Sequence, residues 1–373
     1  MKIIEKKADF RDFLKNLQVR GVAANSSIER SVSEILDDVK VNGDSAVLKY
    51  TKKFDDETAG KITVSSAEIK KIAARAKPEI VKALESAARR IRKFHEKQTE
   101  RSWSFSEGDT VLGQIIRPLK RVGVYVPGGK AAYPSTVLMN VIPAQVAGVK
   151  EIAVCVPIPG GEINPYVMAA IRMLGIKEVY GIGGAQAVAA MAFGTKTIKK
   201  VDKIAGPGNI YVATAKKMVF GHVDIDMIAG PSEILIIADR TANPVFVAAD
   251  MLSQAEHDEL ASAVLVTDSR QLAERVSEEI NMQLAALKRH KIASASLDQY
   301  GAIVITKNIR DAADLSNQIA PEHLEVMTEK PGDILPMIEN AGAIFLGPWT
   351  PEALGDYAAG PNHTLPTGGT SRF

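Results

Sequence analysis

Cysteine is almost absent from this chain, since Cys155 is the only one in 373 residues. A single cysteine excludes an internal disulfide and is typical of a protein that works in a reducing compartment. A strong charge of one sign is also lacking, because 46 Lys and Arg residues balance 44 Asp and Glu residues, for a formal net charge of +2. Such a balance provides no electrostatic footprint for nucleic acid or for an anionic membrane. We therefore expect a small-molecule partner, with no nucleic acid and no membrane.

Long apolar runs are missing as well. The first residues, MKIIEKKADF, lack the apolar core of a signal peptide, and no later run approaches the length of a membrane span. Internal repeats and low-complexity linkers are not seen. The sequence therefore predicts a cytoplasmic protein. Its length exceeds what one hydrophobic core usually supports, so we expect two closely packed domains.

Short apolar runs alternate with helix-like stretches from about residue 111 onward. Repeated βα units with continuous apolar strands are typical of parallel sheets that helices cover on both faces. These units are too many for one compact sheet, so the predicted fold class is α/β, with two doubly wound Rossmann-like domains. The predicted strands are 122–127, 151–157, 178–183, 233–239, 262–268, 302–307 and 343–347. The predicted helices between them are 135–148, 164–175, 184–194, 209–219 and 243–257.

The first 110 residues differ from the rest, with charged helical stretches and little strand pattern. They predict an N-terminal helical segment. Its run RRIRKFHEKQTER (89–101) mixes both charges, which favours a solvated helix face over a nucleic-acid patch. We also expect His95 and His290, which lie among lysines and arginines, to be solvated.

Three glycine-rich turns each follow a predicted strand and open a predicted helix. They are YVPGGKAAYPS (125–135), GIGGAQA (181–187) and AGPGNIY (205–211). The carboxyl ends of parallel strands are where α/β folds bind phosphates and dinucleotides. None of the turns is a G-x-G-x-x-G or a Walker A motif, and βα turns need glycine for positive φ in any case. Three in succession on one sheet nevertheless favour a shared nucleotide crevice.

A polar cluster in SQAEHDE (253–259) is a candidate metal site. Gln254 and His257 are three positions apart, so on a helix both side chains project from one face. Histidine is a common zinc ligand, and amide and carboxylate oxygens complete harder sites. Asp356, in the glycine- and proline-rich segment 355–369, could complete such a shell. The alternative is the polar surface of an ordinary helix.

The segment APEHLE places Glu322 and His323 side by side after Pro321. Adjacent residues of a helix or strand point apart, so both could serve one site only at an irregular helix end, which a proline permits. An imidazole suits a general base, and a neighbouring carboxylate could orient it or activate water. A salt-bridged surface dipeptide is the alternative. Cys155 lies inside an apolar run, where a thiol behaves as a small hydrophobe, so we expect no catalytic role for it.

Seven segments together resemble the histidinol dehydrogenase family, in the order that the family has them. They are RVGVYVPGGKAAYPS, GGAQAVAA, AGPGN, AGPSE, DMLSQAEHD, APEHLE and GDYAAGPNHTLPTGG, and they span nearly the whole chain. The resemblance implies a homodimer with one zinc ion per subunit and two Rossmann-like domains. It also implies oxidation of L-histidinol through L-histidinal to L-histidine with two NAD, the last steps of histidine biosynthesis.

The resemblance also implies a role for each matching residue. Zinc would be bound by Gln254, His257 and Asp356, and the catalytic pair would be Glu322 and His323. NAD would contact Tyr125, Gln186 and Asn209, one in each glycine-rich turn. The substrate would contact Ser232, Gln254, His257, His323, Asp356 and His363.

The domain boundaries that we expect follow from these roles. Residues 1–118 and 237–373 would form one discontinuous α/β domain, which includes the N-terminal helical segment and carries the metal and catalytic residues. Residues 119–236 would form the Rossmann-like NAD-binding domain.

One feature departs from the family pattern. Members of the family continue past TSRF with a helical tail that supplies a further zinc-ligand histidine and a substrate-binding glutamate to the partner subunit, whereas this sequence ends at Phe373. We therefore expect impaired turnover of this form. Two alternatives stay open: a paralogous dehydrogenase of another small alcohol, and a catalytically silent protein that binds NAD or metal.

Overall fold

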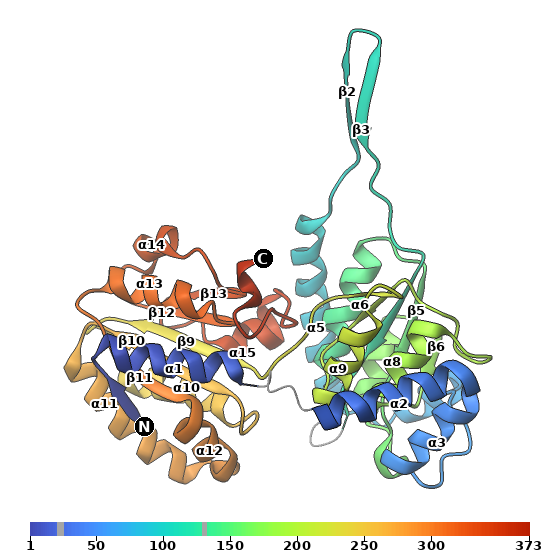
Figure 1. Cartoon of the computed structure of the whole chain (residues 1–373), viewed down its shortest axis with the longest axis horizontal. Coiled ribbons are helices and arrows are strands. Elements are labelled where there is room, and N and C mark those ends of the chain that lie inside the picture. Colours follow the sequence, from blue (N-terminus) through green and yellow to red (C-terminus); the bar gives the residue numbers. More distant parts are fainter. Residues whose placement is uncertain (21–25, 129–132) are drawn as a thin grey trace. The chain divides into compact units, whose positions relative to one another are not determined.

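The computed structural model describes residues 1–20, 26–128 and 133–373. These residues form two compact units, and Figure 1 labels most of their elements. The first unit comprises Met1–Ala24, Ala229–Gly355 and Leu365–Phe373, and the second comprises Asn25–Ile228 and Asp356–Thr364. None of the helices in the described ranges combines the length and the apolar character that a membrane crossing requires.

The second unit is built on a five-stranded parallel sheet with the strand order β6-β5-β4-β7-β8. Counted along the chain from β4, this is the order 3-2-1-4-5 of a doubly wound fold. Its strands are β4 (Arg121–Tyr125), β5 (Glu151–Cys155), β6 (Glu178–Tyr180), β7 (Lys203–Ala205) and β8 (Asp224–Ile225). The crossover helices are α6 (Pro134–Val146), α7 (Pro165–Met173), α8 (Gly184–Phe193) and α9 (Ile210–Val219), and a short 3-10 turn, Pro159–Gly161, follows β5.

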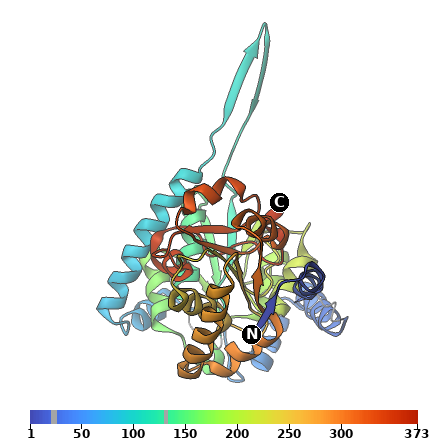
Figure 2. The ribbon, with the colours of Figure 1, turned by 90° about the vertical axis from the view of Figure 1, so that its left-hand side faces the viewer.

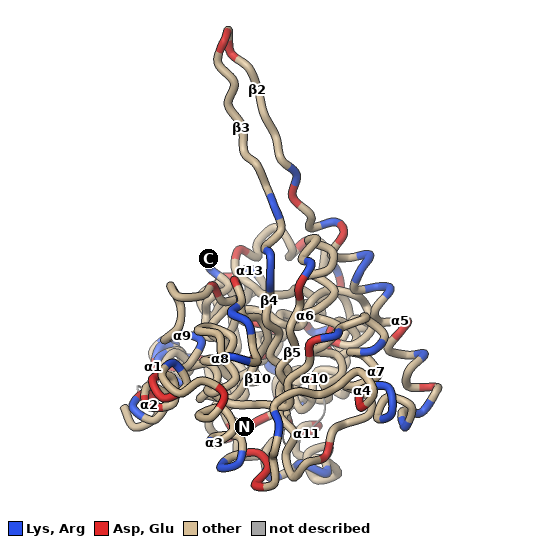
Figure 3. The backbone as a smooth tube through the Cα atoms, turned by 90° about the vertical axis from the view of Figure 1, so that its right-hand side faces the viewer, with Lys and Arg blue, Asp and Glu red and all other residues tan. Residues whose placement is uncertain are grey.

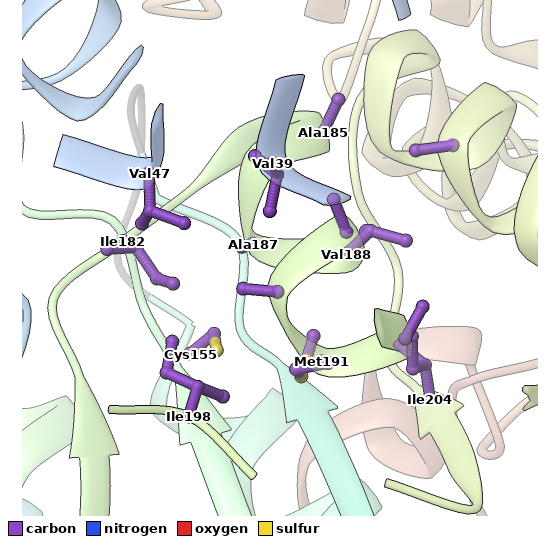
Figure 4. Close-up of a cluster of buried hydrophobic side chains, with 14 of the residues drawn as sticks. Val39, Val47, Cys155, Ile182, Ala185, Ala187, Val188, Met191, Ile198 and Ile204 are labelled. Carbon is purple, nitrogen blue, oxygen red and sulfur yellow. The ribbon is translucent and has the colours of Figure 1, made fainter. Parts of the chain in front are cut away.

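Alternate residues of these strands enter two cores, one on each face of the sheet. Val122 and Val124 of β4 pack with α6 and α7, whereas Tyr125 and Cys155 pack with α8 and α9. Figure 4 shows the second core, where Cys155 lies among aliphatic side chains. At Gly123 a Cβ would lie only 2.5 Å from Sδ of Met191, so a glycine allows α8 to approach the sheet this closely.

The N-terminal helices cover both faces of this same sheet. Helices α2 (Ser26–Asn42) and α3 (Asp44–Phe54) join the core of α8 and α9, while α4 (Ser66–Ala73) and α5 (Pro78–His95) join the core of α6 and α7. A short turn, Glu96–Gln98, extends α5. Residues 25–118 therefore group with the glycine-rich turns and not, as the predicted boundaries have it, with the first unit.

The first unit has a six-stranded parallel sheet with the order β1-β11-β10-β9-β12-β13. Counted from β9 it repeats the order 3-2-1-4-5, and β1 adds a strand at one edge. The strands are β1 (Lys2–Ile4), β9 (Glu233–Ala238), β10 (Ser262–Thr267), β11 (Gly301–Ile305), β12 (His323–Met327) and β13 (Ala343–Leu346). The structure thus confirms the α/β fold class with two doubly wound parallel sheets.

Helices cover both faces of this sheet too. Ile234 and Ile236 of β9 face the core of α10, α11 and α12, whereas Leu235 and Ile237 face that of α1 and α13. The helices are α1 (Lys7–Val19), α10 (Pro244–Ala255), α11 (Arg270–Ala286), α12 (His290–Tyr300), α13 (Ile309–Ile319) and α14 (Pro331–Ile334). The shorter elements are Leu335–Met337, α15 (Glu352–Leu354), the π-helix Gly355–Ala359 and Thr370–Arg372.

An antiparallel hairpin of β2 (Trp103–Glu107) and β3 (Thr110–Gln114) belongs to the second unit but pairs with neither parallel sheet. It extends away from its unit in both views of the ribbon (Figures 1 and 2), and every residue of its strands is exposed. Its only charged residues are Glu107 and Asp109 near the turn, which are red at its tip in Figure 3.

Candidate active site

The predicted catalytic pair lies in an irregular segment between a helix and a strand of the first unit. Helix α13 ends at Ile319, and Ala320 then adopts a left-handed conformation with a φ of 54°. Pro321 and Glu322 follow, and β12 begins at His323. The irregular backbone allows these two adjacent side chains to reach one site, which the sequence leads us to expect only of an irregular segment. Both are buried, with 5% of Glu322 and 2% of His323 exposed.

Glu233, the first residue of β9, contacts both members of this pair. Its main-chain N–H donates to Oε2 of Glu322 over 3.0 Å, and its side chain accepts from the N–H of Glu322 over 3.3 Å. Its main-chain carbonyl lies 3.0 Å from Nδ1 of His323. A carbonyl can only accept, so Nδ1 carries the proton and the neutral imidazole has its lone pair on Nε2. This tautomer is the one that a base acting through Nε2 requires.

The carboxylate of Glu233 is held by two further groups. The guanidinium of Arg20 donates to Oε1 over 2.5 Å in a buried ion pair, and the N–H of Gly368 donates to the same oxygen over 3.2 Å. The segment 365–373 is attached next to the pair as well, because Ser371 donates to the carbonyl of Ala320 over 2.9 Å. The position of Glu322 thus depends on residues from the beginning and the end of the described chain.

Burial dominates the electrostatics of Glu322. It raises the pKa of this carboxyl from its ordinary 4.5 to about 8, and the nearby imidazole of His323 only partly opposes the effect. Burial raises the pKa of Glu233 in the same way, although the charge of Arg20 lowers it. A carboxyl with the pKa of Glu322 can exchange a proton near neutral pH, which is typical of acid–base sites.

A second carboxylate, Glu352, also lies near His323, with Oε1 3.8 Å from Nδ1. It also orients Gln254, which is fully buried at the end of α10. When the Gln254 amide is placed to satisfy both groups, its nitrogen donates to both carboxylate oxygens over 3.0 Å. The amide oxygen of Gln254 is then its remaining polar atom, and it is the atom that a hard metal ion would bind.

Two further acids, the buried Glu325 and the half-buried Asp250, interact near Glu352. The carboxylate of Glu325 accepts the main-chain N–H of Glu352 over 2.7 Å. Burial raises the pKa of Glu325 well above its ordinary value, and the charge of Asp250 raises it further. Burial also raises the pKa of Asp250, to about 6, while its hydrogen bond with Glu325 acts in the opposite direction. Burial therefore disfavours the ionised form of both acids.

The other predicted ligands of metal and substrate come from both units. His257 lies just beyond α10 and is exposed, with its N–H donating to the carbonyl of Gln254 over 3.2 Å. Ser232 precedes β9 directly and is half-buried. Asp356 and His363 belong to the segment that groups with the second unit. The convergence of Gln254, His257 and Asp356 on one metal ion therefore stays a prediction.

The three glycine-rich turns follow β4, β6 and β7, at the carboxyl edge of the sheet of the second unit. The hydroxyl of Tyr125, in the first turn, accepts the N–H of Gly184 in the second turn over 3.1 Å. The N–H of Gly183 donates to the carboxylate of Asp55 over 3.2 Å. The first and third turns flank the point between β4 and β7 where the strand order reverses, which is where open α/β sheets bind ligands. Residues 129–132 of the first turn lie outside the described residues.

The predicted cofactor residues differ in how their polar atoms are used. Gln186 is 1% exposed, and neither its amide oxygen nor its amide nitrogen has a hydrogen-bond partner among the described residues. A buried amide without partners is costly unless a ligand satisfies it. Asn209 is exposed and caps α9, where its oxygen accepts from the N–H groups of Tyr211 and Val212 over 3.1 and 3.2 Å.

Two expectations about single residues have opposite outcomes. Cys155 is fully buried and burial raises the pKa of its thiol strongly, as expected of a residue without a nucleophilic role. The prediction of a solvated His95 is wrong, because this side chain is 6% exposed. Its Nδ1 lies 2.7 Å from the carbonyl of Ile91, and its Nε2 lies 3.2 Å from the amide of Asn362. His290 is exposed, as expected.

A cavity of about 680 Å³ opens in the second unit, and its lining includes Ala205, the first residue of the third glycine-rich turn. Helix α6 and the base of the hairpin line it, together with Asp226, Met227 and Asn362. Neither Tyr125, Gln186 nor Asn209 is among its lining residues. We therefore do not assign the dinucleotide to this cavity.

The sequence did not single out Arg20, Glu233 or Glu352. Glu233 stands in the AGPSE motif, directly before the apolar run ILIIA, and an acid at the start of a buried strand is a usable signal. Glu352 precedes the GDYAAGPNH segment by a few residues without a distinguishing pattern. Arg20 is 211 and 213 residues away from its partners Pro231 and Glu233, and nothing in its neighbourhood indicates the pairing.

Comparisons with known proteins agree with the motifs. The sequence model of the family described as histidinol dehydrogenase matches residues 18–373. The histidinol dehydrogenase of Geobacter metallireducens is 55% identical over 95% of this chain and 82% of the relative. That of Lactococcus lactis is 49% identical over 100% of this chain and 88% of the relative. The crystal structure of histidinol dehydrogenase from Elizabethkingia anophelis has a TM-score of 0.94 at 41% identity, covering 100% of this chain and 86% of that one.

Proposed function

Because the chain belongs to the histidinol dehydrogenase family and is therefore an oxidoreductase of histidine biosynthesis, we propose that it oxidises L-histidinol through L-histidinal to L-histidine with two NAD. The observation that carries the proposal is the buried pair of Glu322 and His323, whose tautomer and orientation Glu233 fixes. This arrangement provides one base that can accept a hydroxyl proton in either oxidation and a second base that can activate water.

His323 acts in the alcohol step. Its Nε2 takes the proton of the substrate hydroxyl while a hydride leaves the carbon that bears this hydroxyl. The main-chain carbonyl of Glu233 stabilises the imidazolium that forms. Glu322 acts in the aldehyde step. In its ionised form the carboxylate takes a proton from the water that adds to the aldehyde, and the raised pKa makes this ionised form a stronger base than an ordinary glutamate. The aldehyde hydrate then loses the second hydride to a second NAD while His323 takes its hydroxyl proton, so His323 serves both oxidations.

NAD, the hydride acceptor, would bind at the reversal point of the second unit. Two observations support this location. Tyr125 and Asn209 belong to the turns that follow β4 and β7. The buried amide of Gln186 has polar atoms without a hydrogen-bond partner among the described residues, which a ligand could satisfy. Because no turn has the G-x-G-x-x-G cradle, we expect weaker binding than a complete Rossmann fingerprint gives.

A zinc ion would be held by Gln254, His257 and Asp356, and when bound it would fix the imidazole and amine of the substrate. The donor set is suitable, because Glu352 takes the amide nitrogen of Gln254 and directs the amide oxygen to the ligand position. His323 and Glu352 also lie close enough to bind one ion together. We assign the metal to the first set, because a ligating His323 could not serve as the base. His257, Asp356, His363 and Ser232 would also contact the substrate.

We further propose that the protein works in the cytoplasm as a homodimer. The lone buried Cys155 is consistent with a reducing compartment. One face of the exposed hairpin carries Trp103, Phe105 and Leu112, since Phe105 and Leu112 are cross-strand partners and Trp103 stacks on Phe105. Two-stranded hairpins are marginal in water by themselves, and exposed apolar faces mark interfaces. A second copy of the chain would cover this face.

The test is an assay of NADH formation with added zinc, using L-histidinol and a panel of other small alcohols. The proposal expects two NADH for each L-histidinol consumed and negligible NADH with the other alcohols. Turnover of a different alcohol alone would favour a paralogous dehydrogenase, and no turnover of any would favour a silent binding protein. The variant Cys155→Ala is a useful control, because activity should survive the loss of the only thiol.

A further inference from the structure

An ion pair between the buried Lys216 and the partly buried Asp226 holds the third glycine-rich turn, although neither residue takes part in the proposed chemistry. Lys216 lies on α9 and is 1% exposed, and its ammonium donates to the carbonyl of Gly206 over 2.9 Å and to Oδ1 of Asp226. Asp226 follows β8 directly, and its Oδ2 accepts the N–H of Gly206 over 2.7 Å. The two side chains thus occupy both the amide and the carbonyl of one glycine.

That glycine determines how the third turn lies against the first. Gly206 has a φ of 113°, in the region that favours glycine, and a Cβ on it would lie 2.1 Å from the carbonyl oxygen of Tyr125. The main chain of the third turn therefore contacts the end of β4 at the reversal point of the sheet. Asn209 follows three residues later and is the N-cap of α9, so its position depends on the conformation of Gly206.

An ion pair is an expensive way to stabilise a turn. The buried ammonium loses its hydration and the partly buried carboxylate loses much of its own, and apolar residues of similar size often stabilise a fold equally well. Their particular effect here is on conformation. A glycine without side-chain contacts samples many backbone states, whereas Gly206 with both its polar groups bound has one.

We propose that Lys216 and Asp226 are positioning residues that hold the third turn in its dinucleotide-binding conformation before the dinucleotide arrives. The inference rests on the proposed NAD site. A turn that is already ordered in the free protein loses little conformational entropy when NAD binds. The ion pair should therefore strengthen the binding of NAD without contacting it.

The test is calorimetric titration of NAD into the whole protein, with matched lysine variants of the same helix. Lys216→Met removes the ammonium from the turn. Lys217→Met is the control, because the neighbouring Lys217 is 60% exposed and forms only a surface pair with Glu29. We expect the Kd for NAD to rise about tenfold or more in Lys216→Met, on the scale of ordering one or two flexible groups, and to stay unchanged in Lys217→Met. The KM for NAD should rise in the same way, while kcat at saturating NAD changes little.

A second variant keeps the test decisive if Lys216→Met does not fold. Lys216→Met combined with Asp226→Leu leaves no unpaired charge and should fold, but it lacks both contacts to Gly206, so weak NAD binding is expected again. Folding is checked by thermal melting. If either folded variant binds NAD as tightly as Lys217→Met does, the pair is merely structural and the inference is wrong. If the unmodified protein fails to bind NAD, the proposed function fails and the inference falls with it.

Discussion

The main-chain carbonyl of Glu233 accepts a hydrogen bond from Nδ1 of His323 over 3.0 Å, and the N–H of the same residue donates to Glu322 over 3.0 Å. Two neighbouring side chains with different chemistry are therefore oriented by one residue of an adjacent strand. Because the contacts to Glu233 fix one tautomer of His323 and one carboxylate position of Glu322, we expect the two oxidations to respond differently to substitution of each residue.

Glu322→Gln should impair oxidation of L-histidinal more than oxidation of L-histidinol, because only the aldehyde step requires an activated water. His323→Asn should slow both steps, since loss of a general base typically lowers a rate by about 10² to 10⁴-fold. The measurement is steady-state kinetics of both variants with each substrate, at matched folded fraction. Equal losses of the two steps in Glu322→Gln would contradict this division of labour.

Glu322 should also make the stability of the protein depend on pH. Its folded-state pKa of about 8 lies above the ordinary 4.5, so between these pH values the folded protein binds a proton that the unfolded chain has released. The contribution of Glu322 to the free energy of unfolding is therefore fully present below about pH 4.5, and it is lost as the pH rises toward 8. Each unit of difference between the folded-state and unfolded-state pKa corresponds to about 1.4 kcal/mol in the free energy of unfolding.

Glu322→Gln cannot titrate, so its free energy of unfolding should decline less between about pH 5 and pH 8 than that of the unmodified protein. Denaturant unfolding of both proteins at the two pH values measures the difference. Glu233, whose pKa is raised as well, contributes to both proteins and cancels in the comparison. Identical slopes in the two proteins would show that the Glu322 carboxyl is not protonated at neutral pH.

How much of this could be read from the sequence differs between elements. All seven predicted strands exist, because each is a continuous apolar run between turn residues, as in the run that becomes β9. Strand β12, HLEVM, escaped prediction, since it buries the polar His323 and Glu325 and so lacks the apolar signal. Such side chains are stable in a core only through hydrogen bonds to partners that no periodicity shows.

The rest depends on which segments become neighbours. Glu233 and Glu322 are 89 residues apart, and only the pairing of β9 with β12 brings them together. The N-terminal helices were assigned to the wrong unit for the same reason, because adjacency along a chain does not show which sheet an amphipathic helix covers. The motifs identified residues with roles, while the residues that orient them, such as Arg20 and Glu352, required the fold.

The buried pair of Arg20 and Glu233 should contribute strongly to the stability of the first unit. Arg20→Met leaves a buried carboxylate without its cation, which typically lowers the free energy of unfolding by about 3–5 kcal/mol. Combining it with Glu233→Met should recover most of that loss, because no lone charge remains. Arg270→Met is the control, since Arg270 is 59% exposed in its pair with Glu5 and exposed pairs contribute about 1 kcal/mol or less. Chemical denaturation of the four proteins measures these differences, and a small effect of Arg20→Met would contradict the buried character of the pair.

Removal of metal should abolish turnover but not the binding of NAD, because the two proposed sites use different residues. Dialysis against a chelator, followed by activity assay and calorimetric titration of NAD, separates the two effects, and added zinc should restore the activity. Gln254→Ala should retain less zinc than the unmodified protein. As a control, Gln283→Ala alters a glutamine that bonds to the carbonyl of Val245 and should keep its zinc. A chelated protein with full activity would exclude an essential metal.

The hairpin provides the last prediction, which concerns assembly. Phe105 and Leu112 lie directly opposite each other on β2 and β3, and they are 50% and 52% exposed. If a second copy of the chain covers this face, replacing both by serine removes apolar area from the interface but disturbs no core. We therefore expect the double variant Phe105→Ser, Leu112→Ser to be a monomer, and the melting temperature of that monomer's core should be almost unchanged.

The control is Met282→Ser, which alters a residue that is 61% exposed on α11 and should leave the protein dimeric. Sedimentation over a range of concentrations distinguishes the two forms. A hairpin variant that sediments as the unmodified dimer would show that the copies associate through another surface, and an unmodified protein that sediments as a monomer would exclude the dimer itself.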